Sequence, residues 1–267
     1  MFNVSTFEDV ICGQDEIDLI GSSLSVFTFF VDGLLLDTGP RSFEQDSAKF
    51  FKNHPIAQVA LSHVHEDHCG MASWLQKNMG VPIYLHKGAI EEASKRADLP
   101  HYRLKIWGER EAFSAISMPD EIITPRHRFE AIDTPGHCAA HMVFYEGEKG
   151  WLFTGDTFIG IRQQVAFREE DLSQTINTLN NLLTLDFDTM FCAHSGVLND
   201  GRRLLEQKLN FLTELQEKIW DMEDQGLTIR EIDRILFPVS HPISDYSEGE
   251  GTSYHMIKTL SSVRKST

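Results

Sequence analysis

The segment from His63 to Gly70 places four metal-ligand side chains within six residues, directly after an apolar stretch with the composition of a buried strand. Alternate residues of an extended chain point to the same side, so His63 and His65 can bind one ion. Asp67 and His68 follow where the chain turns toward Gly70, and they can face a second ion. The segment therefore requires a fold that holds a strand end rigidly, and it indicates a two-metal site.

Three more candidate ligands lie at the ends of predicted strands. His137 closes Thr134-Pro-Gly-His137, Asp156 closes Phe153-Thr-Gly-Asp156, and His194 follows an apolar run that begins at Thr189. Glycine or proline beside the first two lets the backbone turn sharply. Five histidines and two aspartates suit Zn²⁺, Fe²⁺ or Mn²⁺, whereas a closed structural zinc site more often uses thiolates. The set is typical of a catalytic centre.

Short apolar runs alternate with amphipathic patterns and with turns rich in glycine and proline. The sequence predicts strands over 17–38, 56–62, 82–86, 128–133, 141–146, 150–154 and 189–193. It predicts helices over 43–53, 71–79, 87–96 and 171–183, and an irregular loop over the site within 98–125. This order predicts an α/β protein with two sheets sandwiched between helices.

From Gly201 onward the pattern is helical. An apolar stripe runs from Leu204 to Ile219, Thr228 and Glu231 form a capping-box pattern, and a last helix is predicted over 253–263. We expect a catalytic domain over 1–200 and a helical extension over 201–267 that packs on it. The stripe could also face a second subunit, so a homodimer is an alternative.

The 267 residues carry a net charge of -16, most of it before residue 200. Nucleic-acid affinity is built on Lys and Arg, so this charge favours a small-molecule substrate over a nucleic-acid partner. The N-terminal segment lacks a secretory pattern, and the most apolar stretch is too short to span a bilayer. We therefore expect a cytoplasmic protein without a membrane partner.

Taken together, the loop His63, His65, Asp67, His68 matches an HxHxDH signature, and the chain resembles metallo-β-lactamase-fold hydrolases. The segments ending in His137 and Asp156 are similar to those of glyoxalase II-like thioesterases and acyl-homoserine-lactone lactonases. The resemblance implies an αββα sandwich of two mixed β-sheets flanked by helices. It also implies that His63, His65 and His137 bind one ion, that Asp67, His68 and His194 bind the other, and that Asp156 bridges them.

By the same resemblance, a hydroxide that bridges two divalent metal ions attacks a small ester-like substrate, a thioester or a lactone. Asp67 would orient this hydroxide and so act as the catalytic residue. Zn²⁺ is the expected metal, with Fe²⁺ and Mn²⁺ as alternatives. From the helical extension we expect substrate contacts by Tyr246, Tyr254 and His255.

Other functions stay open at this point. Mono-iron persulfide dioxygenase-like enzymes keep the same loop, and a metal-containing signalling or partner-binding protein with weak hydrolase activity would also fit. Asp67 by itself could cap the following helix. Five further histidines are predicted to be surface or strand residues without a ligand role: His54, His86, His101, His127 and His141.

Overall fold

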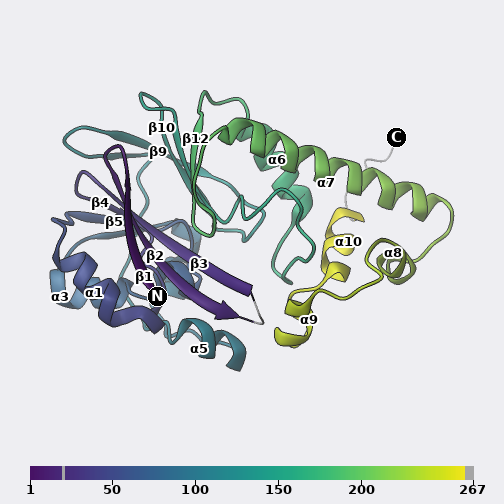
Figure 1. The fold of residues 1–267 in the computed structure, drawn as a ribbon, viewed down its shortest axis with the longest axis horizontal. Helices are drawn as coiled ribbons and strands as arrows, with labels where there is room; N and C mark the ends of the chain where they lie inside the picture. The colour runs from purple at the N-terminus through teal and green to yellow at the C-terminus, as the bar shows by residue number, and fades with distance from the viewer. Residues whose placement is uncertain (20–21, 262–267) are drawn as a thin grey trace.

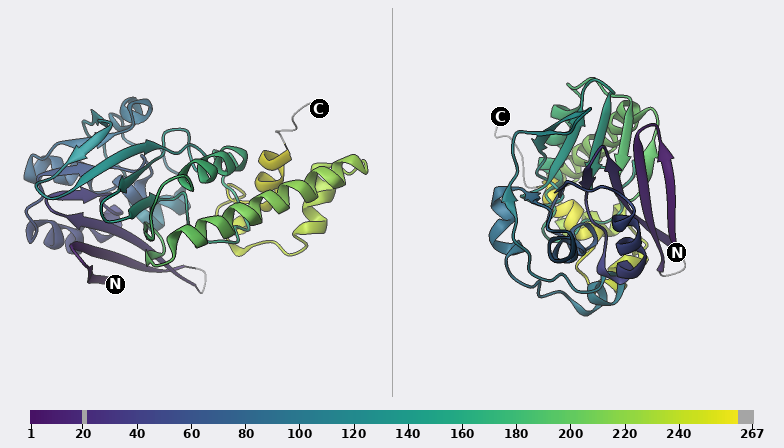
Figure 2. Two further views of the ribbon diagram at one scale, coloured as in Figure 1. Left: turned by 90° about the horizontal axis from the view of Figure 1, so that it is seen from above. Right: turned by 90° about the vertical axis from the view of Figure 1, so that its left-hand side faces the viewer.

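The computed structural model describes residues 1–19 and 22–261. Two mixed β-sheets pack face to face, and helices cover the outer face of each (Figures 1 and 2). The predicted αββα sandwich is therefore confirmed.

The first sheet orders seven strands as they occur in the chain. They are β1 (Phe2–Phe7), β2 (Val10–Leu19), β3 (Ser22–Val31), β4 (Leu34–Leu36), β5 (Gln58–Ala60), β6 (Ile83–Leu85) and β7 (Ile116–Ser117). The strands up to β4 pair antiparallel, whereas β4 to β7 pair parallel. Parallel pairing needs crossover connections, and these carry the helices of this half.

The second sheet has the spatial order β13, β12, β11, β10, β9, β8. Its strands are β8 (Glu121–Ile123), β9 (Arg128–Asp133), β10 (Met142–Glu146), β11 (Trp151–Gly155), β12 (Thr189–Cys192) and β13 (Gly196–Leu198). Only the β11–β12 pair is parallel among the described strands of this sheet. Helix α6 (Leu172–Leu182) lies in that crossover connection.

Helices lie in the connections between strands, and the described part of the chain from residue 201 onward is helical apart from its connections. They are η1 (Arg41–Phe43), α1 (Glu44–Lys52), α2 (Glu66–Cys69), α3 (Ala72–Met79), η2 (Lys87–Ala89), α4 (Ile90–Ala93), α5 (His101–Trp107), α6 (Leu172–Leu182), α7 (Gly201–Asp224), α8 (Ile229–Leu236), α9 (Pro242–Tyr246) and α10 (Ser253–Ser261). The capping box at the start of α8 is confirmed, because Thr228 accepts from the Glu231 backbone and the Glu231 side chain accepts in return.

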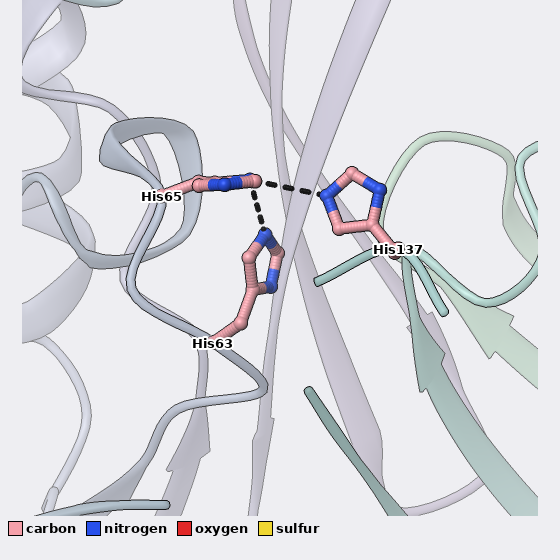
Figure 3. A group of neighbouring side chains, drawn as sticks. All are labelled: His63, His65 and His137. Carbon is pink, nitrogen blue, oxygen red and sulfur yellow. Dashed lines mark hydrogen bonds between the residues drawn. The ribbon is translucent and has the colours of Figure 1, made fainter. Parts of the chain in front are cut away.

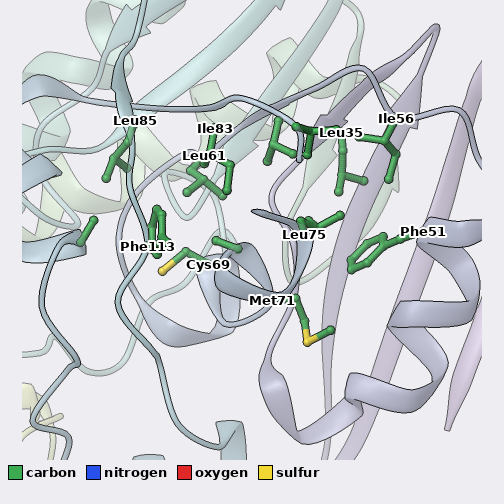
Figure 4. Close-up of a cluster of buried hydrophobic side chains, with 14 of the residues drawn as sticks. Leu35, Phe51, Ile56, Leu61, Cys69, Met71, Leu75, Ile83, Leu85 and Phe113 are labelled. Atoms are coloured by element: carbon green, nitrogen blue, oxygen red, sulfur yellow. The ribbon is translucent and has the colours of Figure 1, made fainter. Parts of the chain in front are cut away.

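Three apolar layers hold the sandwich together. Helices α1 and α3 bury residues such as Phe51 and Leu75 against one face of the first sheet (Figure 4). Aromatic rings fill the space between the sheets, where Phe153 and Phe191 stack with centroids 4.3 Å apart. Helices α6 and α7 cover the second sheet, α8 and α10 pack on these helices, and residues such as Leu212 are fully buried in this layer.

The structure contains several elements that the sequence does not predict, among them β7, β8, β13 and α9. The sequence predicts no strand before residue 17, yet β1 and most of β2 lie there; β1 is an edge strand with mostly exposed side chains, so its burial pattern is weak. The segment expected to be irregular contains α5, which begins after Pro100 and buries Tyr102 and Ile106 on one face.

The C-terminal helices pack on α6 and on one another, as the apolar stripe of α7 predicts. The last predicted helix ends at Ser261, and its expected residues 262 and 263 lie outside the described residues. The division of the chain at residue 200 into two domains stays a prediction.

Candidate metal centre

The loop after β5 and the β9–β10 loop bring three histidines together. His63 Nε2 lies 2.9 Å and His137 Nε2 lies 3.0 Å from the same atom, Nδ1 of His65 (Figure 3). A ring nitrogen carries either one hydrogen or one lone pair, so Nδ1 of His65 cannot make good hydrogen bonds to both neighbours at once. Three imidazole nitrogens converging on one point are the arrangement of ligands around a metal ion.

A second group forms next to the first. His68 Nε2 and His194 Nε2 lie 3.2 and 3.3 Å from Asp156 Oδ1, and 3.6 and 3.5 Å from Asp67 Oδ2. The ligand atoms of these four residues all lie within 4.8 Å of one another. Asp67 sits in the first turn of α2, whose N-cap residue is His65, so its carboxylate faces this group rather than capping the helix.

Asp156 connects the two groups. Its Oδ1 faces His68 and His194, whereas its Oδ2 lies 3.4 Å from His137 Nε2 of the first group. One carboxylate oxygen thus points at each group, as a bridging ligand requires.

The donor atoms fit divalent metal ions. Within the described part of the chain, His68 Nε2 and Asp156 Oδ1 are buried and have no hydrogen-bond partner, which is costly unless a ligand completes them. Burial lowers the pKa of His63 and of His65 well below the usual value, so both rings are neutral and can donate a lone pair. Burial alone would raise the pKa of Asp156, but His194 and His68 hold it well below its usual range.

The outer nitrogens of these histidines are held by other elements. His68 Nδ1 lies 2.9 Å from Asp37, His137 Nδ1 lies 3.1 Å from Glu170, and His194 Nδ1 contacts the Ser25 carbonyl at 2.8 Å. Such contacts fix the orientation of a ligand ring. No sequence signal pointed to Asp37 or Glu170, because each comes from a distant element and looks like an ordinary turn or helix-start acid.

Two glycines allow the chain to pass close to the site. A Cβ on Gly155, whose φ is +47°, would lie 2.7 Å from His141 Nε2. A Cβ on Gly136 would lie 2.4 Å from Thr175 Oγ1. Each precedes a candidate ligand, so a larger residue would displace Asp156 or His137.

Lys208 of α7 reaches the site from the C-terminal helices. Its side chain is 2% exposed, and Nζ donates to the Thr157 carbonyl at 2.9 Å, directly beside Asp156. Burial lowers the pKa of Lys208. The contact ties α7 to the turn that carries the central carboxylate.

The structure thus brings together all seven candidate ligands, and it corrects the expected placement of two histidines. The sequence predicts surface or strand positions for His127 and His141, but both are buried and lie directly before β9 and β10. His127 Nδ1 lies 3.0 Å from Glu146, and His141 Nε2 accepts from the Asp156 backbone at 3.1 Å. Neither belongs to the two ligand groups, so the prediction of no ligand role is unaffected.

A cavity of about 760 Å³ opens beside His65. The α4–α5 segment, the β9–β10 loop, Glu169 and Glu250 contribute to its walls. The three predicted substrate contacts are not among the lining residues: Tyr246 packs on Tyr102, Tyr254 on Arg230, and His255 lies 3.4 Å from the Gly249 carbonyl. Their role in substrate binding stays a prediction.

None of the helices in the described ranges has the length and apolar character that crossing a membrane demands.

Comparisons with known proteins identify the family of this chain. Residues 24–194, more than half of the chain, match the Metallo-beta-lactamase superfamily. The lactamase-like protein aptB of Emericella nidulans is 30% identical over 171 residues, which are 62% of this chain and 48% of that protein. The atrochrysone carboxyl ACP thioesterase of Passalora fulva is 26% identical over 82% of this chain and 69% of its own length. A hydroxyacylglutathione hydrolase of Nitrosomonas eutropha is 27% identical over 65% of this chain and 61% of its own.

Solved structures show the same fold. A metallo-beta-lactamase family protein from Thermus thermophilus superposes with a TM-score of 0.68 at 18% identity, covering 95% of this chain and 91% of that one. A metallo-beta-lactamase from Pontibacter korlensis gives 0.62 at 17% identity, covering 80% and 99%. The chain spans about half the length of the Emericella nidulans relative. With its fold, its loop and its matched segment in agreement, the chain belongs to the metallo-beta-lactamase superfamily.

Proposed function

We propose that this protein is a hydrolase that cleaves a small ester-like substrate, a thioester or a lactone, at a centre of two divalent metal ions. His63, His65 and His137 would hold one ion, Asp67, His68 and His194 the other, and Asp156 would bridge them. Zn²⁺ is the metal we propose first, with Fe²⁺ or Mn²⁺ as alternatives.

The orientation of Asp156 carries the proposal. Its two oxygens face different ligand groups, at 3.2 to 3.4 Å from the three nearest imidazole nitrogens. A mono-iron enzyme needs only one group, whereas here a second group is complete and contains two buried atoms without hydrogen-bond partners among the described residues.

When bound, such ions lower the pKa of water toward neutrality and polarise a carbonyl group. The residues of the chain do the positioning. Asp67 is 7% exposed, and its Oδ2 faces both His68 and His194. Its other oxygen can therefore accept a hydrogen bond from the attacking water or hydroxide and orient it. Asp37, Glu170 and the Ser25 carbonyl fix the imidazole rings from behind.

The names of the relatives support a thioester as substrate. One is an ACP thioesterase and another a hydroxyacylglutathione hydrolase. The cavity beside His65 has the volume for a small organic molecule.

Metal content and turnover test the proposal together. We expect close to two ions per chain by elemental analysis, and hydrolysis of model thioesters or lactones. Asp156→Ala should bind fewer ions and lose at least about 100-fold in kcat. The exposed Asp221→Ala on α7 is the matched control, and it should keep both metal content and rate.

One ion per chain after metal supplementation, with oxidation of a persulfide and no ester hydrolysis, would support the dioxygenase alternative. Full metal content without turnover of any substrate would support a signalling or partner-binding role.

A further inference from the structure

Charged side chains of both signs line the cavity beside His65. It opens next to a candidate ligand, so its position as the substrate site rests on the proposed function and not on its charges. The charges of the lining residues then determine which substrate charge the cavity prefers.

The two inner cations of the wall are already neutralised. Arg103, whose side chain is 16% exposed, makes two hydrogen bonds to the buried carboxylate of Glu66, at 2.5 and 2.9 Å. Arg110 is 2% exposed, donates to the Lys95 and Glu92 carbonyls, and lies 3.8 Å from the Glu92 carboxylate. Neither guanidinium is available to a substrate anion without breaking these contacts.

The outer cations are also paired. Lys95 lies 2.7 Å from Glu91, and Arg96 pairs with Glu109. The carboxylate of each pair offsets the positive charge of its partner, so each pair adds little net positive field inside the cavity.

Three other carboxylates of the wall are not the main partner of any of these four cations. Asp98 and Glu250 have no ion pair among the described residues, and Glu250 accepts a hydrogen bond from the Tyr102 hydroxyl at 2.7 Å. Glu169 is half exposed, 3.5 Å from His65 Nε2 and 4.0 Å from Arg103. They come from three separate segments, and all three line the cavity.

We propose that this cavity selects thioesters or esters whose far end, away from the bond that is cleaved, carries a positive charge, and that it disfavours those with an anionic far end. Like charge facing like charge lowers both capture and affinity, whereas opposite charge raises them. The preference concerns only the end that faces Asp98, Glu169 and Glu250.

A matched series of three thioesters tests the charge preference. Butyrylthiocholine is cationic, S-(3,3-dimethylbutyl) thiobutyrate is its neutral isostere, and S-butyryl-2-mercaptoethanesulfonate is anionic. We expect kcat/KM to fall in that order at low salt, by roughly 10-fold or more from the first to the last, and the ratio to shrink in about 0.5 M NaCl.

The double variant Asp98→Asn, Glu250→Gln should reduce the cation-to-anion ratio of kcat/KM by about 5-fold or more. Glutamine at 250 keeps an acceptor for Tyr102. The control Glu217→Gln removes an exposed carboxylate of α7 that is not among the lining residues, and it should leave the cation-to-anion ratio unchanged.

Binding of the uncleavable S-butyl thioethers of thiocholine and mercaptoethanesulfonate to the zinc-loaded protein, measured by calorimetry, separates this inference from the proposed function. If the cationic thioether binds more tightly and no ester is cleaved, the charge inference stands and the hydrolase proposal fails. If the esters are cleaved without charge preference, the charge inference is overturned and the hydrolase proposal stands. If the sulfonate thioether binds as tightly as the cationic one, the charge inference is overturned whether or not the esters are cleaved.

Discussion

Asp15 makes the stability of this protein depend on pH. It lies on β2, is 2% exposed, and its Oδ1 has no hydrogen-bond partner among the described residues. Burial raises the pKa of this carboxyl from 3.8 to about 8; the N-terminal amino group of Met1 lowers it in part, and Asp46 adds to the rise.

Between about pH 4 and pH 8 the folded chain therefore holds a proton at Asp15 that the unfolded chain has lost. Stability falls as pH rises wherever the folded state binds more protons, by about 1.4 kcal/mol per pH unit for one group. The contribution is complete below the unfolded value near 4 and is lost by about pH 8. We expect Asp15→Asn, which cannot ionise, to gain roughly 4 kcal/mol of stability relative to the wild type between about pH 5 and pH 8.

Urea unfolding of the metal-free protein at about pH 5, 6, 7 and 8, followed by tryptophan fluorescence, measures this difference. Asp18→Asn, an exposed carboxylate on the same strand, is the control and should leave the pH profile unchanged. The reasoning is refuted if the wild type and Asp15→Asn keep a constant difference in free energy of unfolding over this range.

Three further changes test the packing. Arg103→Met should lower the free energy of unfolding by about 3 kcal/mol, because it leaves the buried Glu66 carboxylate unpaired; the double variant with Glu66→Gln should recover much of it in urea titrations. Thr228→Ala removes the capping box of α8 and should cost about 1 kcal/mol, and an equal loss in Thr228→Ser would argue against capping as the cause. A chain ending at Leu198 should expose the apolar surface under α7 and α10 and aggregate on expression, which light scattering would show; a monodisperse, folded product would contradict this.

The candidate ligands could be predicted from the sequence because their spacing is local. His63, His65, Asp67 and His68 lie in one loop, and the other three each follow a recognisable strand with a glycine or proline nearby. The contacts that hold the rings could not be read from the sequence. Asp37 precedes His68 by 31 residues, and only the tertiary fold shows that their side chains meet.

Elements with weak burial patterns could not be predicted either. Strand β1 alternates little because most of its side chains face solvent. Helix α5 is seven residues long, too short for a clear period, although Tyr102 and Ile106 lie on one buried face. The environment of His141 could not be predicted from the sequence either, because nothing in the residues next to it indicates that the Asp156 backbone N–H donates to its ring.

We expect the contact between Lys208 and the Thr157 carbonyl to link the docking of α7 thermodynamically to metal binding at the proposed centre. Linkage is reciprocal, so whatever metal affinity this contact confers must reappear as an equal gain in the free energy needed to undock α7 when the ions bind. Removing the metal would then lower the free energy needed to undock α7 by the same amount. Amide hydrogen exchange along α7, compared with and without chelator, would report the metal status of a site that lies on another element.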